Sequence, residues 1–268
     1  MTSTAQHQSQ LDPSTEAFYK KTLSLLVESK IPFMLGGAYA LSQFMDFERH
    51  TRDLDVFVYR KDAQRILDVL SAAGFKTEMM FPHWLGKAFS GEDYVDVIFA
   101  SGNGIAEVDE ESFEHAKPAE LLGIPVIALP AEDIIWSKAF IMERERYDGA
   151  DIAHLFRACG HQLDWNRLLA RFGEHWRVLL SHLILFGYIY PSHQSQIPDW
   201  VMTELLGKVS AEMAAKPETD KVCQGTILSR GQYLVDIDKW GYADARLEPR
   251  GHMNARDIAR WTAAIDKK

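Results

Sequence analysis

The pattern of apolar and polar residues changes its period along the first half of the chain. Residues 15–29 place Phe18, Leu23 and Leu26 on one helical face, whereas residues 54–58 alternate as a half-buried strand does. Further strand-like runs cover residues 31–35, 76–81, 88–99 and 125–129, and further helical runs cover residues 38–44 and 61–73. This alternation predicts an α/β (α+β) fold with a small mixed sheet and helices on one side of it.

The second half of the chain has mainly the helical period. We expect helices over residues 131–141, 151–157, 165–172, 175–186 and 198–214. Residues 179–189 are apolar almost throughout, so we expect them to be buried in a helical bundle. A hairpin is expected from residues 226–229 and 232–235. These boundaries predict a disordered leader over 1–13, an α/β domain over 14–130, a helical domain over 131–216 and an extension of unclear role over 217–268.

Two glycines and three carboxylates form the most informative pattern. Gly36 and Gly37 end an apolar run just before a short helical stretch. Asp53 and Asp55 are two positions apart in a predicted strand, so their side chains point off the same face. Asp96 lies in the middle of another strand-like run. Together these residues predict a site for a divalent metal ion and phosphate.

The residue types explain that prediction. Mg²⁺ is a hard cation that is held by a few carboxylates together with substrate phosphates. Two such ions about 3.5–4 Å apart activate an attacking hydroxyl and stabilise the leaving oxygen. Glycines let the backbone approach phosphate closely.

The order of these motifs resembles the DNA-polymerase-beta-like nucleotidyltransferases. The closest kinds are the small bacterial antibiotic nucleotidyltransferases and the nucleotidyltransferase toxins of type IV abortive-infection systems. The resemblance covers roughly residues 30–160 and has one departure, since fifteen residues separate Gly37 from Asp53. It implies a sheet of the nucleotidyltransferase type, with Mg²⁺ or Mn²⁺ as cofactor and an NTP such as ATP as substrate. Catalysis and metal binding fall to Asp53, Asp55 and Asp96, and nucleotide binding to Gly36, Gly37 and Thr51.

A second motif follows at residues 136–151. It resembles the later lysine- and arginine-containing motif of the same family, which implies that Lys138 contacts a nucleotide phosphate and that Arg146 contacts a phosphate or the acceptor. A Lys ammonium is a mobile point charge suited to that task. Glu145 lies seven residues after Lys138 and would share its face if the helix continued. Asp148 or Asp151 would hold the basic groups in place.

The composition of the chain limits the kinds of partner and cellular compartment that we expect. The 268 residues carry a net charge of −9, which disfavours a large nucleic-acid footprint. Neither Cys159 nor Cys223 lies in a pairing or metal-ligand motif, which fits a reducing cytoplasm. The ten histidines are scattered and form no zinc-ligand pattern. We expect no membrane span, and the sequence says nothing about oligomeric state.

The acceptor remains open at this stage: an RNA, a protein or a small hydroxyl compound such as an aminoglycoside-like drug. A macromolecular acceptor, RNA or protein, is slightly favoured, because the helical half is large for a pocket that holds only a small drug. Three arginines that lined one face would make a patch for it, and the candidates are Arg144, Arg146, Arg157, Arg167 and Arg171. An alternative on the same fold is a catalytically silent nucleotide-binding or toxin–antitoxin partner protein. The retention of three mutually repelling carboxylates favours the enzyme.

Overall fold

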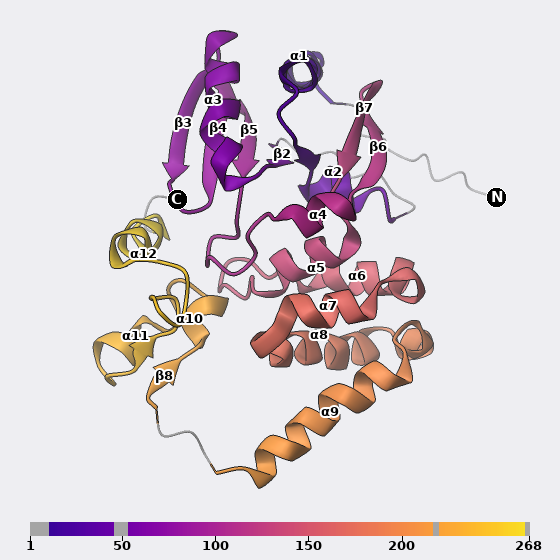
Figure 1. Cartoon of the computed structure of the whole chain (residues 1–268), viewed down its shortest axis with the longest axis vertical. Helices are drawn as coiled ribbons and strands as arrows, with labels where there is room; N and C mark the ends of the chain where they lie inside the picture. The colour runs from indigo at the N-terminus through magenta and orange to yellow at the C-terminus, as the bar shows by residue number, and fades with distance from the viewer. Residues whose placement is uncertain (1–10, 46–52, 217–219, 266–268) are drawn as a thin grey trace, which may run out of the picture. The chain divides into compact units, whose positions relative to one another are not determined.

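A computed structural model describes residues 11–45, 53–216 and 220–265 (Figure 1). The chain divides into two compact units. Unit 1 comprises residues 1–80, 85–99 and 108–130, and unit 2 comprises residues 81–84, 100–107 and 131–268.

Unit 1 contains a seven-stranded mixed sheet whose strand order is β3-β4-β5-β2-β1-β7-β6. The strands are β1 (Met34–Leu35), β2 (Asp53–Phe57), β3 (Lys76–Phe81), β4 (Leu85–Ser90), β5 (Asp93–Ile98), β6 (Lys117–Leu121) and β7 (Ile124–Ala128). β2 is parallel to β5 and β1 is parallel to β7, whereas the pairs β1–β2, β4–β5 and β6–β7 are antiparallel. The predicted fold class is therefore confirmed.

Unit 1 also contains α-helices. They are α1 (Pro13–Ser29), α2 (Gly37–Leu41), α3 (Ala63–Ala72) and α4 (Glu110–Glu114). α3 contacts β4 and β5, and α1 contacts β5 and β7. Leu54 and Val56 of β2 and Val95 and Val97 of β5 are fully buried, which supplies the core beneath those helices.

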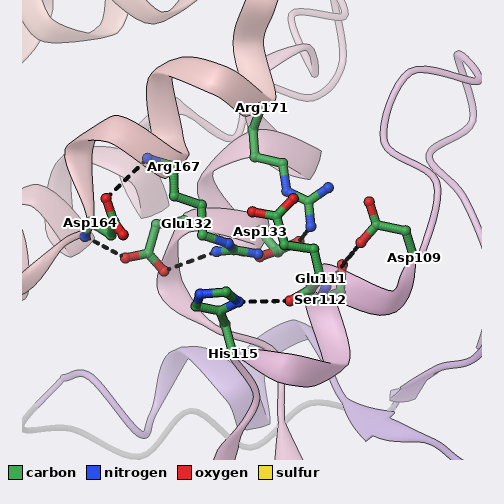
Figure 2. A network of polar contacts seen from close by, with 9 residues as sticks. All are labelled: Asp109, Glu111, Ser112, His115, Glu132, Asp133, Asp164, Arg167 and Arg171. Carbon is green, nitrogen blue, oxygen red and sulfur yellow. Dashed lines mark hydrogen bonds and ion pairs between the residues drawn. The ribbon is translucent and has the colours of Figure 1, made fainter.

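Two elements of unit 1 were not predicted. α4 begins after Asp109, whose carboxylate accepts a hydrogen bond of 2.9 Å from the amide of Ser112, as an N-cap does (Figure 2). β6 pairs with β7 across a turn in which Leu122 and Gly123 both have positive φ. Both elements are five residues long, and β6 carries exposed Lys117, so hydrophobic period alone does not reveal them.

Unit 2 is mainly helical. Its longer helices are α5 (Ala131–Ala139), α6 (Gly149–Cys159), α7 (Trp165–Phe172), α8 (Trp176–Ile189) and α9 (Asp199–Ala214). The C-terminal part holds β8 (Val222–Cys223), α10 (Gly225–Leu228), α11 (Leu234–Asp238), β9 (Ala243–Asp244) and α12 (Ala255–Thr262). In the part of the chain that the structure describes, no helix has the length and apolar character that crossing a membrane requires.

Two expectations about unit 2 were wrong. α8 is not buried on all sides: Leu179, Leu183 and Phe186 form a buried stripe, whereas the side chain of Tyr188 is 84% exposed. Its neighbouring helices therefore cover one stripe of it and leave the rest in water.

The expected hairpin of residues 226–235 is instead α10 and α11. The hydroxyl of Ser229 accepts the amide of Gln232 at 3.2 Å and closes a turn between the two helices. Local hydrogen bonds of this kind compete with strand pairing.

Candidate active site

The three candidate carboxylates lie on one face of the sheet in unit 1. In β2, Asp53 and Asp55 are half-buried, and they alternate with the buried side chains beneath the helices. β5 runs parallel to β2 with Asp96 directly opposite Asp55. Residues opposite each other on paired strands project to the same side, so the register brings together residues that are 41 positions apart, from 55 to 96.

All three carboxylates lie close enough to Tyr94 to affect its pKa. Tyr94 lies opposite Asp53 in the same strand pair. Burial raises the pKa of Tyr94, and the negative charges of Asp53, Asp96 and Asp55 raise that pKa further. The sequence analysis did not single out Tyr94, although its place two residues before Asp96 was a usable signal.

The two glycines bring the backbone against β2. The amide of Gly36 donates to the carbonyl of Asp55 at 2.9 Å. Gly37 has a φ of +52°, and a Cβ there would collide with the carboxylate of Asp55, with Cγ only 2.8 Å away. A Cβ on Gly36 would likewise collide with the ring of Phe57. Both glycines are therefore required by their positions, and Gly37 leaves the space that the Asp55 carboxylate occupies.

The helix after these glycines is shorter than predicted. α2 ends at Leu41 rather than at residue 44, so it is little more than one turn. Its dipole is correspondingly small, and the contribution of the glycines is the close approach of backbone rather than the end of a long helix.

Lys87 is the main residue that the sequence analysis missed. It lies in β4 directly opposite Asp96, and its Nζ is 2.6 Å from Oδ1 of Asp96. Its ammonium also lies 3.8 Å from the ring centroid of Tyr94. The predicted strand began at residue 88, one position too late to include it. The row Asp55–Asp96–Lys87 thus crosses three neighbouring strands.

Burial is the main influence on Asp96. It raises the pKa of that carboxyl, the ion pair with Lys87 lowers it, and the charge of Asp53 raises it again. The net pKa of Asp96 lies above its ordinary value of 3.8. The carboxylate is therefore held in its charged form largely by Lys87.

The donor set is compatible with a hard divalent cation. Carboxylate oxygens are the ligands that Mg²⁺ prefers, and Gly37 lacks the Cβ that would fill the space of the Asp55 carboxylate. Among the residues that the structure describes, no three His, Cys, Asp or Glu side chains converge as metal ligands. A metal here would consequently take further oxygen ligands from a bound phosphate.

The second motif forms an ion-pair cluster in unit 2. Nζ of Lys138 lies 2.7 Å from Oδ2 of Asp148 and 2.9 Å from Oδ2 of Asp151. Arg146 donates from Nε and Nη2 to the two oxygens of Asp148, each at 2.8 Å. The proposed role of the two aspartates in holding the basic groups agrees with these contacts, whereas Glu145 does not share a helix with Lys138, because α5 ends at Ala139.

The cluster has an asymmetric exposure. Burial by itself would raise the pKa of Asp148, but hydrogen bonds from Arg146 and the charge of Lys138 bring it below its ordinary value. The Lys138 side chain is 15% exposed, whereas that of Arg146 is 60% exposed. Lys138 is therefore the more enclosed of the two cations that pair with Asp148.

Two of the five arginines considered for an acceptor patch are buried. Arg167 pairs with Glu132 and Asp133, and Arg171 pairs with Asp133 at 3.2 Å (Figure 2). Their side chains are 3% and 7% exposed. They stabilise the packing of α5 against α7 and are not surface cations. Thr51, also a predicted nucleotide contact, lies outside the described residues.

No protein-family model matches the chain, and neither does any curated protein sequence. Solved structures do match. One is the antibiotic-resistance factor ANT(2'')-Ia, at 19% identity and a TM-score of 0.47, covering 64% of this chain and 98% of the other. Another is the lincosamide antibiotic adenylyltransferase LnuA, at 14% identity and a TM-score of 0.37, covering 52% and 92%.

A third match is an antigenic nucleotidyltransferase-like protein from Paracoccidioides brasiliensis. Its identity is 15% and its TM-score 0.47, and the match covers 68% of this chain and 93% of the other. The chain is similar to nucleotidyltransferases. At these identities and scores, the function rests on the site itself.

Proposed function

We propose that this protein is a nucleotidyltransferase that moves a nucleoside monophosphate from an NTP to a hydroxyl group. In this reaction the hydroxyl oxygen forms a bond to the α-phosphorus, the bond to pyrophosphate breaks, and the hydroxyl proton leaves. The observation that carries the proposal is the register that sets Asp55 opposite Asp96, with Asp53 on the same face and Gly37 against Asp55.

The metal site in this proposal consists of Asp53 and Asp55. A bound Mg²⁺ would neutralise charge on the triphosphate and polarise its phosphorus–oxygen bonds. The two glycines keep side chains away from the Asp55 carboxylate and allow phosphate to approach the backbone. Catalysis of this kind depends mainly on positioning and charge neutralisation.

Asp96 is assigned to the acceptor rather than to the metal. Its carboxylate is already paired with Lys87, and a carboxyl whose pKa is raised by burial is a better proton acceptor than an ordinary one. We assign Lys138 and Arg146 to the phosphates of the nucleotide, as the later motif implies; both cations are held by Asp148.

The acceptor in this proposal is a small hydroxyl compound. The sequence slightly favoured RNA or protein, for which three arginines on one face would make a patch. Arg167 and Arg171 are taken up by buried ion pairs and Arg146 is assigned to the nucleotide, so two of the five candidates remain, and the chain as a whole is acidic. A small acceptor does not require the basic surface that a nucleic acid needs.

The test uses each labelled NTP with Mg²⁺ and three acceptor pools: small hydroxyl compounds, bulk tRNA and cell protein. Asp53→Asn combined with Asp55→Asn should abolish labelling and leave the fold intact, because the change relieves repulsion between carboxylates. Asp68→Asn is the matched control, since that carboxylate is exposed on α3. Full activity of the double variant would refute the metal site, and labelling of tRNA alone would refute the small acceptor.

Asp96→Asn separates its two possible roles. A proton acceptor should lose turnover while the affinity for Mg·NTP stays close to that of the wild type. A large loss of that affinity would return Asp96 to the metal site.

A further inference from the structure

The loop between α5 and α6 is held both by its own contacts and by residues far along the chain. Residues 140–148 carry Arg146 and Asp148, and an isolated bridge between Met142 and Tyr147 closes the loop. The amide of Glu143 donates to the carbonyl of Arg146 at 2.8 Å. The amide of Asp148 donates to the carbonyl of Ile141 at 3.2 Å, and the ring of Tyr147 stacks on that of His182. The bridge and the Asp148 hydrogen bond join the two ends of the segment, and the turn hydrogen bond closes its tip at residues 143–146.

The C-terminal part of unit 2 makes further hydrogen bonds to this loop. The carboxylate of Glu143 accepts the hydroxyl of Ser229 at 2.6 Å and the amide of Arg230 at 3.1 Å. The amide of Met142 donates to the carbonyl of Leu228 at 3.1 Å. The side chain of Gln232 donates to the carbonyl of Met142 at 3.3 Å.

Arg230 makes the only charged contacts among these that bridge two residues of the loop. Its guanidinium lies 3.4 Å from Glu143 and 3.2 Å from Glu145, and its side chain is 16% exposed. Partly buried arginine–carboxylate contacts are stronger than exposed ones, because water screens them less. Arg230 therefore holds the side chains of Glu143 and Glu145 together.

The C-terminal part is itself anchored within unit 2. Asn103 donates to the carbonyl of Ile227 at 2.9 Å, and that asparagine is buried. The guanidinium of Arg230 lies 5.9 Å from the ring centroid of Trp261, and that ring also lies close to Gly102. The contacts to the loop thus come from a fixed framework and not from a free tail.

We propose that residues 222–262 position the 140–148 loop for nucleotide binding, with Arg230 as the positioning residue. Arg230 acts through Glu143 and Glu145, which keep the loop in the conformation where Arg146 and Lys138 share Asp148. The inference rests on the proposed function, because it assigns the loop to the nucleotide, and it gives the C-terminal extension a role.

The experiment compares Arg230→Ala with Arg230→Lys and with Arg250→Ala. Arg250 is a matched control in the same segment, where it makes an exposed ion pair with Asp220. Hydrogen exchange of the peptide covering 140–148 is measured without nucleotide. Binding of Mg·ATP, or of the NTP that the wild type prefers, is measured by calorimetry, and turnover is followed separately.

We expect Arg230→Ala to speed exchange of the loop and to weaken nucleotide binding about tenfold, the scale of one charged hydrogen-bonded contact. Turnover at saturating nucleotide should change much less, so the effect appears in KM. Arg230→Lys should restore part of the affinity, because it keeps the charge and loses the planar fork. Arg250→Ala should match the wild type in both measurements.

Exchange in Arg230→Ala equal to that in Arg250→Ala would overturn the proposal, and so would faster exchange with unchanged affinity. If Arg230→Ala does not fold, the same measurements are made on Gln232→Ala. The Gln232 side chain is exposed, and this variant removes only its hydrogen bond to Met142. Failure of the proposed function gives a different result. The wild type then binds no nucleotide, which overturns the role of the loop in binding. Hydrogen exchange of the loop still differs between Arg230→Ala and Arg250→Ala in that case.

Discussion

Replacing Gly37 with alanine tests the arrangement of the site directly. A left-handed φ of +52° costs an alanine about 1–2 kcal/mol. The new Cβ also collides with the Asp55 carboxylate, and such overpacking costs about 1–3 kcal/mol more. We therefore expect Gly37→Ala to lower the free energy of unfolding by about 2–5 kcal/mol, the sum of the two ranges.

Gly91 provides a matched control for the backbone part of this loss. Its φ is +63°, and nothing lies within 4 Å of an added Cβ. Gly91→Ala should therefore cost only the backbone term of about 1–2 kcal/mol. The difference between the two variants isolates the collision with Asp55.

The assay is urea unfolding followed by circular dichroism, with Asp55→Ala and the double variant completing a cycle. Removing the carboxylate leaves only the Cβ of Asp55, at 3.3 Å from the new methyl group, so Gly37→Ala should be better tolerated in that background. We expect a favourable coupling of about 1–3 kcal/mol. Strictly additive losses would refute the close approach of Gly37 to Asp55, whatever the protein's activity. Binding of Mg·NTP should be lost in Gly37→Ala and kept in Gly91→Ala.

Three further changes probe ion pairs. Lys87→Met should destabilise the protein more at pH 7 than at pH 5. The pKa of Asp96 is raised in the folded state, so the free energy of unfolding falls as the pH rises from the unfolded-state pKa of 3.8 through the folded-state pKa, and the loss of Lys87 enlarges that fall. An equal loss at both pH values in urea unfolding would contradict this. Lys138→Ala should weaken NTP binding in calorimetry by about 1.5–3 kcal/mol, and unchanged affinity would remove Lys138 from the phosphate site. Arg167→Met should destabilise by about 3–5 kcal/mol because it takes a buried guanidinium away from Glu132 and Asp133, of which Asp133 keeps Arg171. The exposed Arg177→Ala should cost about 0–1 kcal/mol, and equal thermal shifts would contradict the burial of the first pair.

The burial of arginines and the structure of the C-terminal part were not predictable from the sequence. Nothing local distinguishes Arg167 from Arg157, yet one is buried against α5 and the other is exposed. A charge is buried only where a partner from another element meets it, and that meeting depends on how helices pack. The hairpin expected around Gly231 failed for a related reason, since a serine hydroxyl and short-range backbone bonds favoured two short helices.

What the sequence determined by itself was local. The period of two placed Asp53 and Asp55 on one face, and the paired glycines marked a turn that only glycine fits well, because side-chain direction and backbone conformation follow from neighbouring residues. The tertiary structure alone decided which strands are neighbours. The parallel pairing of β2 with β5 set Asp55 opposite Asp96, the antiparallel pairing of β4 added Lys87, and packing within unit 2 brought Arg230 to Glu143. These contacts join residues far apart in the chain, and their register is fixed by burial of one face of the whole sheet, which no short segment specifies.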